Sequence, residues 1–119
     1  MNFSGRFADL VASRTKRQSI RVDKHNRYRV GTWLQLYTGL RTKQAQKLTD
    51  ADPVIMANYS VMIDPDELVL AGTRIPPDQR EHFAHMDGFA DYRDMLEWFQ
   101  HTYKRREFMG RCIRWEFAS

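Results

Sequence analysis

The chain has 119 residues and a formal net charge of +4. Its composition, 42% hydrophobic and 13% aromatic, excludes a disordered tail, and its length predicts one compact domain over residues 1–119. Its one cysteine, Cys112, excludes an internal disulfide framework and a cysteine-based zinc site. Because there is no apolar run of about 18 residues and no signal-peptide core, we expect a soluble cytoplasmic protein without a membrane partner.

The first half of the chain predicts one helix and two strands. Phe7, Leu10 and Val11 lie at i, i+3 and i+4, which predicts a short helix over 6–13 with Ser4 as its cap. The alternation at 18–22 predicts a strand, and residues 32–39 read as a second strand. Residues 41–48 fit either a helix or a long loop.

The second half predicts strands first and helices after them. Residues 54–63 and 67–75 each predict one strand, the latter with a kink at Gly72. Helices are expected over 77–86, ended by Gly88, and over 91–103, and a last strand follows Gly110. Short strands with little parallel-crossover pattern predict an α+β fold, in which flanking helices surround a barrel-like antiparallel sheet.

Isolated residues with metal-binding or nucleophilic chemistry carry weak signals. His82 and His85 are spaced to share a helix face, with Asp87 two residues on, but without further ligands we expect no metal and no cofactor. A lone strand cysteine such as Cys112 is expected to be a buried apolar residue.

The strongest chemical signal is a basic cluster in residues 13–21, SRTKRQSIR. Residues 1–50 hold eleven Lys/Arg against three Asp/Glu, and residues 51–119 hold eight against twelve, so we expect a positive face that meets phosphates unless the charges are only solvated. Ser19 and Arg21 share a strand face, whereas Lys16 reaches Ser19 only if it lies in the turn before the strand. An anion-binding strand is favoured over a catalytic Lys–Ser pair. The cations of the cluster are Arg14, Lys16, Arg17 and Arg21.

The order of these motifs resembles the ASCH domains, small relatives of the PUA domains. The resemblance rests on Phe7 and its helix, TKRQSIR, RVGTWLQLYTG, FAHMDGFADYRDMLEWF and the closing GRCIRW. The resemblance extends over nearly the whole chain. The arrangement of the chain is similar to that of the stand-alone ASCH proteins of bacteria and their phages. It implies a PUA-like β-barrel with mixed or antiparallel strands and flanking helices.

The resemblance also implies a function. Some ASCH proteins are amidohydrolases that deacetylate N4-acetylcytidine, with a Lys-x-x-Thr-x-Arg box and a carboxylate. By that pattern Ser19 is the nucleophile, Lys16 its base and Asp87 the carboxylate, while Arg21 fixes the substrate or the lysine. The chain departs from the pattern by having Ser19 for threonine, Asp87 for glutamate, and Thr32 for aspartate.

Two alternatives to a nucleoside amidohydrolase stay open. One is a non-catalytic module that binds RNA and stacks a base on Tyr37 or Trp33. The other is a ribonuclease on single-stranded RNA, another activity described in the family. The sequence does not predict the oligomeric state. The residues expected to bind RNA or a modified nucleoside are Arg14, Arg17, Arg21, Tyr37, Arg41 and Lys43, with Lys16 added in the binding module.

Overall fold

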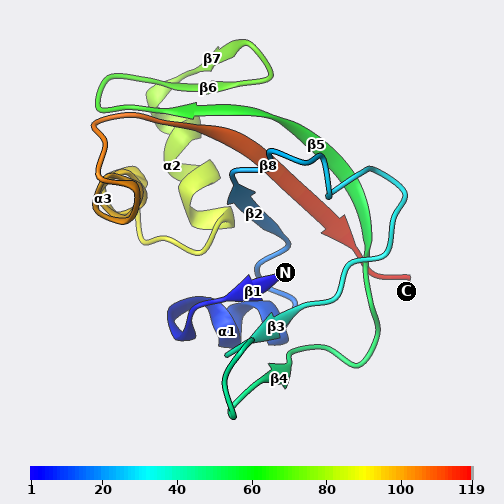
Figure 1. Cartoon of the computed structure of the whole chain (residues 1–119). Helices are drawn as coiled ribbons and strands as arrows, with labels where there is room; N and C mark the ends of the chain where they lie inside the picture. The colour runs from blue at the N-terminus through cyan, green and yellow to red at the C-terminus, as the bar shows by residue number, and fades with distance from the viewer. Residues whose placement is uncertain (119) are drawn as a thin grey trace.

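A computed structural model describes residues 1–118 and has an α+β fold of three helices and two sheets (Figure 1). The helices are α1 (Gly5–Ala12), α2 (Pro77–Met86) and α3 (Tyr92–Tyr103). The strands are β1 (Asn2–Phe3), β2 (Gln18–Arg21), β3 (Tyr37–Thr38), β4 (Gln46–Lys47), β5 (Val54–Ile63), β6 (Leu68–Leu70), β7 (Thr73–Ile75) and β8 (Phe108–Glu116). None of these helices has the length and apolarity needed to span a membrane.

The larger sheet is antiparallel and has the strand order β2-β8-β5-β6-β7. Its long central strands, β5 and β8, run side by side across the molecule, and α2 and α3 lie together at one end (Figure 1). The smaller sheet has the order β1-β3-β4 and lies beside α1, with β1 and β3 parallel. The site described below lies where these two parts meet.

The expected barrel is not closed. Over residues 1–118 the strands form two separate sheets, and one isolated bridge, from Trp33 to Val54, joins the segment before β3 to the start of β5. The expected strand over 32–39 shrinks to Tyr37–Thr38, because Leu34 and Leu36 form hydrogen bonds with the loop at Pro53 and with Leu48. These contacts bury both leucines without an extended ladder.

Most other elements lie where the sequence placed them. The helices at 77–86 and 92–103 and the strands at 18–21 and 54–63 are confirmed, and the last strand starts two residues before Gly110. The single strand expected over 67–75 is instead the hairpin β6–β7, because Ala71 and Gly72 both adopt positive φ and reverse the chain. Residues 41–48 are mostly loop, ending in β4.

The helices begin and end through different contacts. Ser4 is the N-cap of α1, but its side chain makes no cap hydrogen bond, and its carbonyl accepts from Phe7 N instead. In contrast, Asp91 caps α3 with its side chain, which accepts from Asp94 N at 2.7 Å. Asp87 ends α2 and is followed by Gly88 at φ +96°, which turns the chain back toward α1.

Candidate active site

A pocket of about 150 Å³ lies between α1, β2, α3 and the turn after α2. Lys16, Ser19 and Asp87 all line it, although they are separated by up to 71 residues in sequence. Arg21 lines it as well. The structure therefore brings together the three residues that the resemblance to ASCH domains implies for catalysis, and Arg21, which it implies for fixing the substrate or the lysine.

The turn between α1 and β2 places Lys16 ahead of the strand. Thr15 N and Lys16 N both donate to the carbonyl of Leu10, and Arg14 adopts a positive φ of 62° to make this reversal. β2 then begins at Gln18. The geometric condition for Lys16 and Ser19 to face one pocket is thus met.

Lys16 and Asp87 form a buried ion pair. Lys16 Nζ lies 3.2 Å from Asp87 Oδ1 and also donates to the Asp87 carbonyl at 2.5 Å, and each residue is only 3% exposed. Gln18 Nε2 donates to the same carboxylate oxygen at 3.2 Å. Gln18 was not predicted as a site residue. The one signal for it in the sequence was the presence of an amide side chain among the cations of residues 13–21.

Burial opposes the charges of this pair. It lowers the pKa of the Lys16 amine and raises the pKa of the Asp87 carboxyl, in each case against the attraction of the partner. Lys16 also lies 5.1 Å from the ring centroid of Phe7, on the apolar side of the pocket. A lysine with a lowered pKa is able to accept a proton from a substrate or a hydroxyl.

Ser19 and Arg21 contact each other directly, as their shared strand face predicts. Arg21 Nε donates to Ser19 Oγ at 2.8 Å, and Arg21 Nη2 donates to the carbonyl of Asn2 at 2.7 Å. The guanidinium also lies 4.9 Å from the ring centroid of Phe3. Because Ser19 Oγ accepts from Arg21, its own proton is free to point to a base, and the cation stabilises negative charge on the oxygen.

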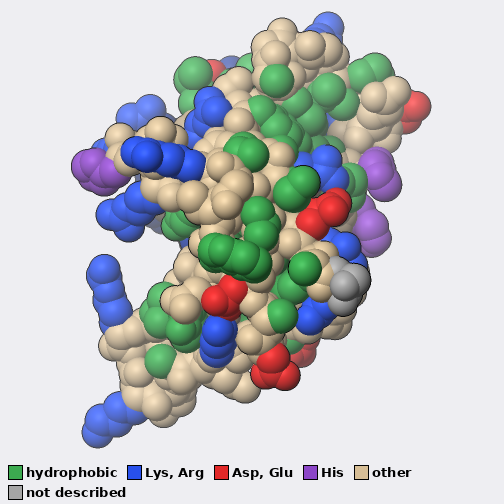
Figure 2. Space-filling view, turned by 90° about the vertical axis from the view of Figure 1, so that its right-hand side faces the viewer, with side chains coloured by type: hydrophobic (Ala, Val, Ile, Leu, Met, Phe, Trp, Pro, Cys, Tyr) green, Lys and Arg blue, Asp and Glu red, His purple; other side chains and the backbone are tan. Residues whose placement is uncertain are grey.

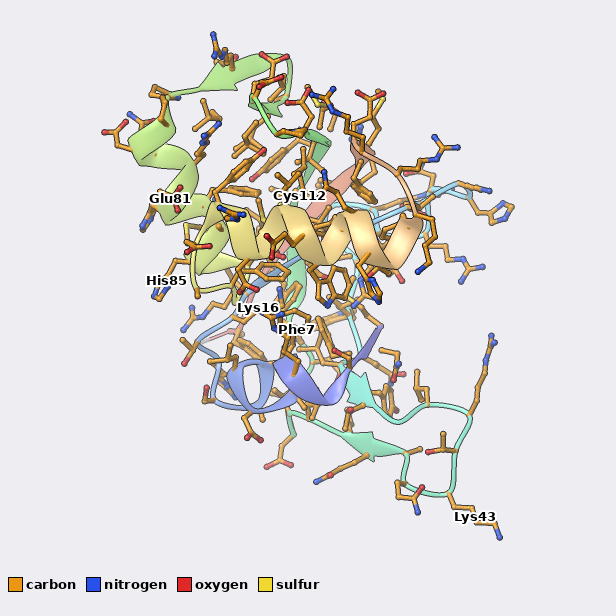
Figure 3. The ribbon with its side chains drawn as sticks, turned by 90° about the vertical axis from the view of Figure 1, so that its left-hand side faces the viewer. Phe7, Lys16, Lys43, Glu81, His85 and Cys112 are labelled. Carbon is orange, nitrogen blue, oxygen red and sulfur yellow. The ribbon has the colours of Figure 1, made fainter. Side chains whose placement is uncertain are left out.

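Aromatic rings form the wall around these polar groups. Phe7 makes edge contacts with Phe89 and Trp98, with centroid distances of 5.2 and 5.8 Å. Figure 3 shows Phe7 beside Lys16, between α1 and α3. On α3, Tyr92, Met95 and Phe99 are buried in the core, and Phe99 also lines the pocket.

Gly88 is needed for the close approach of α1 to the turn after α2. A Cβ at this position would lie 3.1 Å from Phe7 Cδ1 and 3.3 Å from Lys16 Cδ, and the φ of +96° disfavours any side chain.

We expect Gly88→Ala to lower the free energy of unfolding by about 2–3 kcal/mol, measured by urea denaturation. Gly72→Ala is the matched control, since it has φ +83° with no atom within 4 Å of the added Cβ. Equal losses in the two variants would contradict the crowding at Lys16.

The remaining residues expected to bind RNA do not line the pocket. Arg14 lies over the ring of Phe117 at 4.0 Å, and Arg17 Nε donates to the Arg14 carbonyl. Arg41 is exposed, and Figure 3 shows Lys43 at the end of its loop, far from Lys16. Tyr37 is half-buried in β3. In Figure 2 the Lys and Arg side chains are dispersed over the visible face and lie on both edges of a notch, instead of forming one patch.

The histidines and the cysteine stay outside this chemistry. His82 and His85 are exposed on α2, while Asp87 turns inward to Lys16, and residues 1–118 contain no group of three or more His, Cys, Asp or Glu placed to hold a metal. Cys112 is fully buried, as expected, and burial raises the pKa of its thiol to about 12.

Comparisons with protein-family models, with curated proteins and with solved structures find no match to this chain.

Proposed function

We propose that the protein is a small hydrolase that removes an acyl group from the exocyclic amine of a nucleobase, with N4-acetylcytidine as the model substrate. One observation carries this proposal: Lys16, Ser19, Arg21 and Asp87 line one aromatic pocket, with their polar atoms in contact in two pairs. This is the constellation implied by the resemblance to the ASCH amidohydrolases. The barrel of that family is not reproduced, so the proposal rests on the site and not on the fold.

The size of the pocket suits this substrate class. A volume of about 150 Å³ is enough for one six-membered ring, such as the base of a pyrimidine nucleoside. The walls of Phe7, Phe89 and Trp98 offer flat apolar surfaces to such a ring. A sugar would then lie at the mouth of the pocket and not inside it.

Acylation of Ser19 is the first half of the proposed reaction. Neutral Lys16 accepts the Ser19 proton while Ser19 Oγ bonds to the acyl carbon, and the Asp87 carboxylate stabilises the lysine ammonium that forms. The C–N bond then breaks, and the Lys16 ammonium gives its proton to the departing amine. The products of this half are cytidine and an acyl ester on Ser19.

Deacylation repeats the same proton transfers with water. Lys16 accepts a proton from water as the water oxygen bonds to the ester carbon, and returns it to Ser19 Oγ as acetic acid leaves; the acid then releases its proton to the solvent as acetate. Arg21 donates to Ser19 Oγ at 2.8 Å and so stabilises this oxygen whenever it carries negative charge. No oxidant, metal or further reactant is needed for the balance.

The proposal is tested by a chromatographic assay of N4-acetylcytidine over a range of pH. We expect cytidine and acetate as products, and a kcat that rises with pH, because only neutral Lys16 accepts the Ser19 proton. The midpoint should lie below the ordinary lysine value of 10.5, since burial lowers the pKa of Lys16.

The absence of product at high enzyme concentration would reject the deacylase. A kcat that falls as pH rises would reject neutral Lys16 as the base. Lys16→Ala, assayed in parallel, should give no product at any pH.

A further inference from the structure

A second hollow adjoins the pocket across the ring of Tyr103. This groove of about 520 Å³ lies between the end of β2, the end of α3 and the start of β8. Tyr103 lines both the groove and the pocket. Its ring centroid lies 4.7 Å from that of Phe108 on the groove side and 6.0 Å from that of Phe99 on the pocket side. The two hollows are therefore neighbours separated by one aromatic side chain.

The groove leaves large apolar side chains uncovered. Met109 is 71% exposed, Val22 45% and Tyr103 37%. Gly110 lets the strands come close here, since a Cβ on it would lie 2.7 Å from the Arg21 carbonyl and 2.8 Å from the Phe108 ring. An apolar surface of this kind next to a reactive pocket indicates a binding region.

Two cations line the same groove without carboxylate partners. Neither Lys24 nor Arg105 forms an ion pair within residues 1–118. Glu107 is the one carboxylate that lines the groove, so its lining carries a net charge of +1. Cationic side chains without an ion-pair partner, next to exposed apolar side chains, fit a ligand that carries both a negatively charged group and a flat ring.

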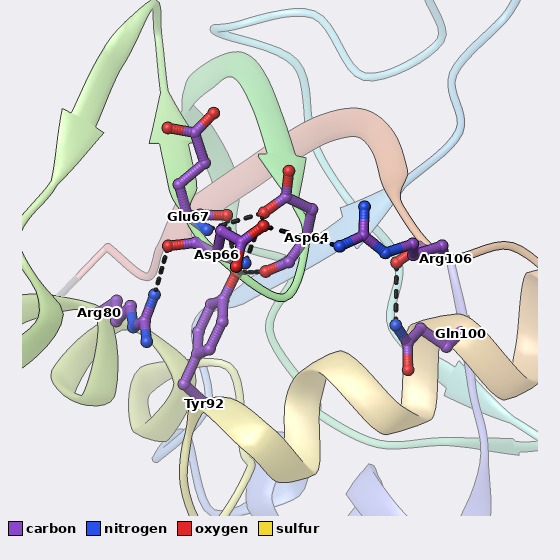
Figure 4. A network of polar contacts seen from close by, with 7 residues as sticks. All are labelled: Asp64, Asp66, Glu67, Arg80, Tyr92, Gln100 and Arg106. Carbon is purple, nitrogen blue, oxygen red and sulfur yellow. Dashed lines mark hydrogen bonds and ion pairs between the residues drawn. The ribbon is translucent and has the colours of Figure 1, made fainter.

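The turn that carries Arg105 is held in place by its neighbours. Gln100 Nε2 donates to the Arg106 carbonyl at 2.9 Å, and Arg106 Nη2 lies 3.6 Å from Asp66 Oδ2 (Figure 4). Lys104 ends α3 in the left-handed conformation, with φ 57°. Arg106 thus turns to the acidic loop before β6, while Arg105 lies at the groove.

We infer that the groove binds a neighbouring nucleotide of a single-stranded nucleic acid, so that the substrate is an acylated base within a strand. The phosphate contacts Lys24 and Arg105, and the adjacent base lies against Tyr103 and Met109. This inference rests on the proposed function, which puts the reacting base in the pocket. The groove is too large and too apolar for a phosphate alone, and its contact with the pocket across Tyr103 matches the order of units along a strand.

The test compares cytidine with the trinucleotide UpCpU, which has a neighbour on both sides of the cytidine. Dissociation constants are measured by calorimetry for the wild type, for Lys24→Gln/Arg105→Gln, and for the control Arg41→Gln/Lys43→Gln. The control removes the same charge from a loop distant from the pocket.

We expect the wild type and the control to bind UpCpU about tenfold more tightly than cytidine, and the groove variant to lose this gain. The slope of log Kd against log salt should be about 0.7 for the wild type, for the one phosphate that Lys24 and Arg105 contact, and fall toward zero in the groove variant. Glu107→Gln should tighten UpCpU binding, because it removes the carboxylate. Equal binding of cytidine and UpCpU by the wild type, or equal losses in the two double variants, overturns the inference.

The two proposals fail separately. If N4-acetylcytidine is not deacylated but UpCpU shows the expected pattern, the deacylase is rejected and the groove remains a strand-binding site. If deacylation occurs and the groove variant binds UpCpU as the wild type does, the groove inference alone is rejected.

Discussion

Ser19→Ala is expected to lower kcat for N4-acetylcytidine by about 10⁴-fold or more, because it removes the atom that would bond to the acyl carbon. The fold should survive this change. Ser19 is small, and Arg21 keeps its hydrogen bond to the Asn2 carbonyl and its contact with Phe3. The loss of the hydrogen bond from Arg21 to Ser19 Oγ should lower the free energy of unfolding by about 1 kcal/mol.

Two further variants separate the nucleophile from a structural role. Ser19→Thr keeps the hydroxyl and introduces the threonine of the ASCH pattern, so it should keep measurable turnover. Ser13→Ala removes an exposed serine hydroxyl in the turn before the strand, where it contacts Thr15 Oγ1, and should leave kcat unchanged. Mass spectrometry of acid-quenched wild type should detect an acyl adduct on Ser19. Wild-type turnover in Ser19→Ala would remove Ser19 from the mechanism.

The position of Lys16 shows how far sequence reasoning reaches in this chain. Strand periodicity forbids a contact across three residues, so a Lys16–Ser19 site requires a turn between them. The structure supplies it with the positive φ of Arg14 and the two hydrogen bonds to the Leu10 carbonyl. Strand periodicity set this condition without showing that the turn exists, and on its own it favoured an anion-binding strand over a Lys16–Ser19 pair.

Gln18 shows where periodicity fails. Alternation places it on the face of β2 opposite Ser19, so it carried no signal for the site. The structure buries both faces of β2, and Gln18 reaches the Asp87 carboxylate from 69 residues away. The partners of such a residue depend on the tertiary packing of the turn after α2, which no local rule encodes.

The missing barrel has a similar cause. Residues 32–39 have the composition of a strand, but only Tyr37 and Thr38 pair within a sheet and only Trp33 bridges to β5. Leu34 and Leu36 form their hydrogen bonds with residues outside the named strands, and both are buried there. Arg14 and Arg17 were grouped with Lys16 by sequence proximity alone. In the folded chain Arg14 contacts Phe117, at the far end of the sequence, and so leaves the pocket.

Asp87→Leu is expected to lower the free energy of unfolding by about 3–5 kcal/mol near neutral pH, because it leaves the buried Lys16 without its carboxylate. The double variant Lys16→Met/Asp87→Leu should recover most of this loss, since two apolar side chains of similar volume replace the pair. Both variants should be inactive. Urea denaturation of the three proteins measures the effect.

The pH dependence of this loss identifies its cause. Burial lowers the pKa of Lys16 even with Asp87 present, so the folded protein binds fewer protons at Lys16 than the unfolded chain does. The contribution of Lys16 to stability then rises with pH up to the ordinary lysine value of 10.5, whereas the raised pKa of Asp87 acts in the opposite direction above its ordinary value of 3.8. The rise should be largest in Asp87→Leu, where no carboxylate attracts the ammonium, and absent in the double variant.

A loss in Asp87→Leu that does not depend on pH would point to packing instead of charge. In that case the double variant would remain as unstable as the single one. If the rise with pH is found, the free-energy cost of burying the charged Lys16 amine both lowers the stability of the fold and lowers the pKa of Lys16, so that the amine loses its proton more easily. The cost in stability and the ability to act as a base then have one physical origin, the burial of Lys16 beside Phe7.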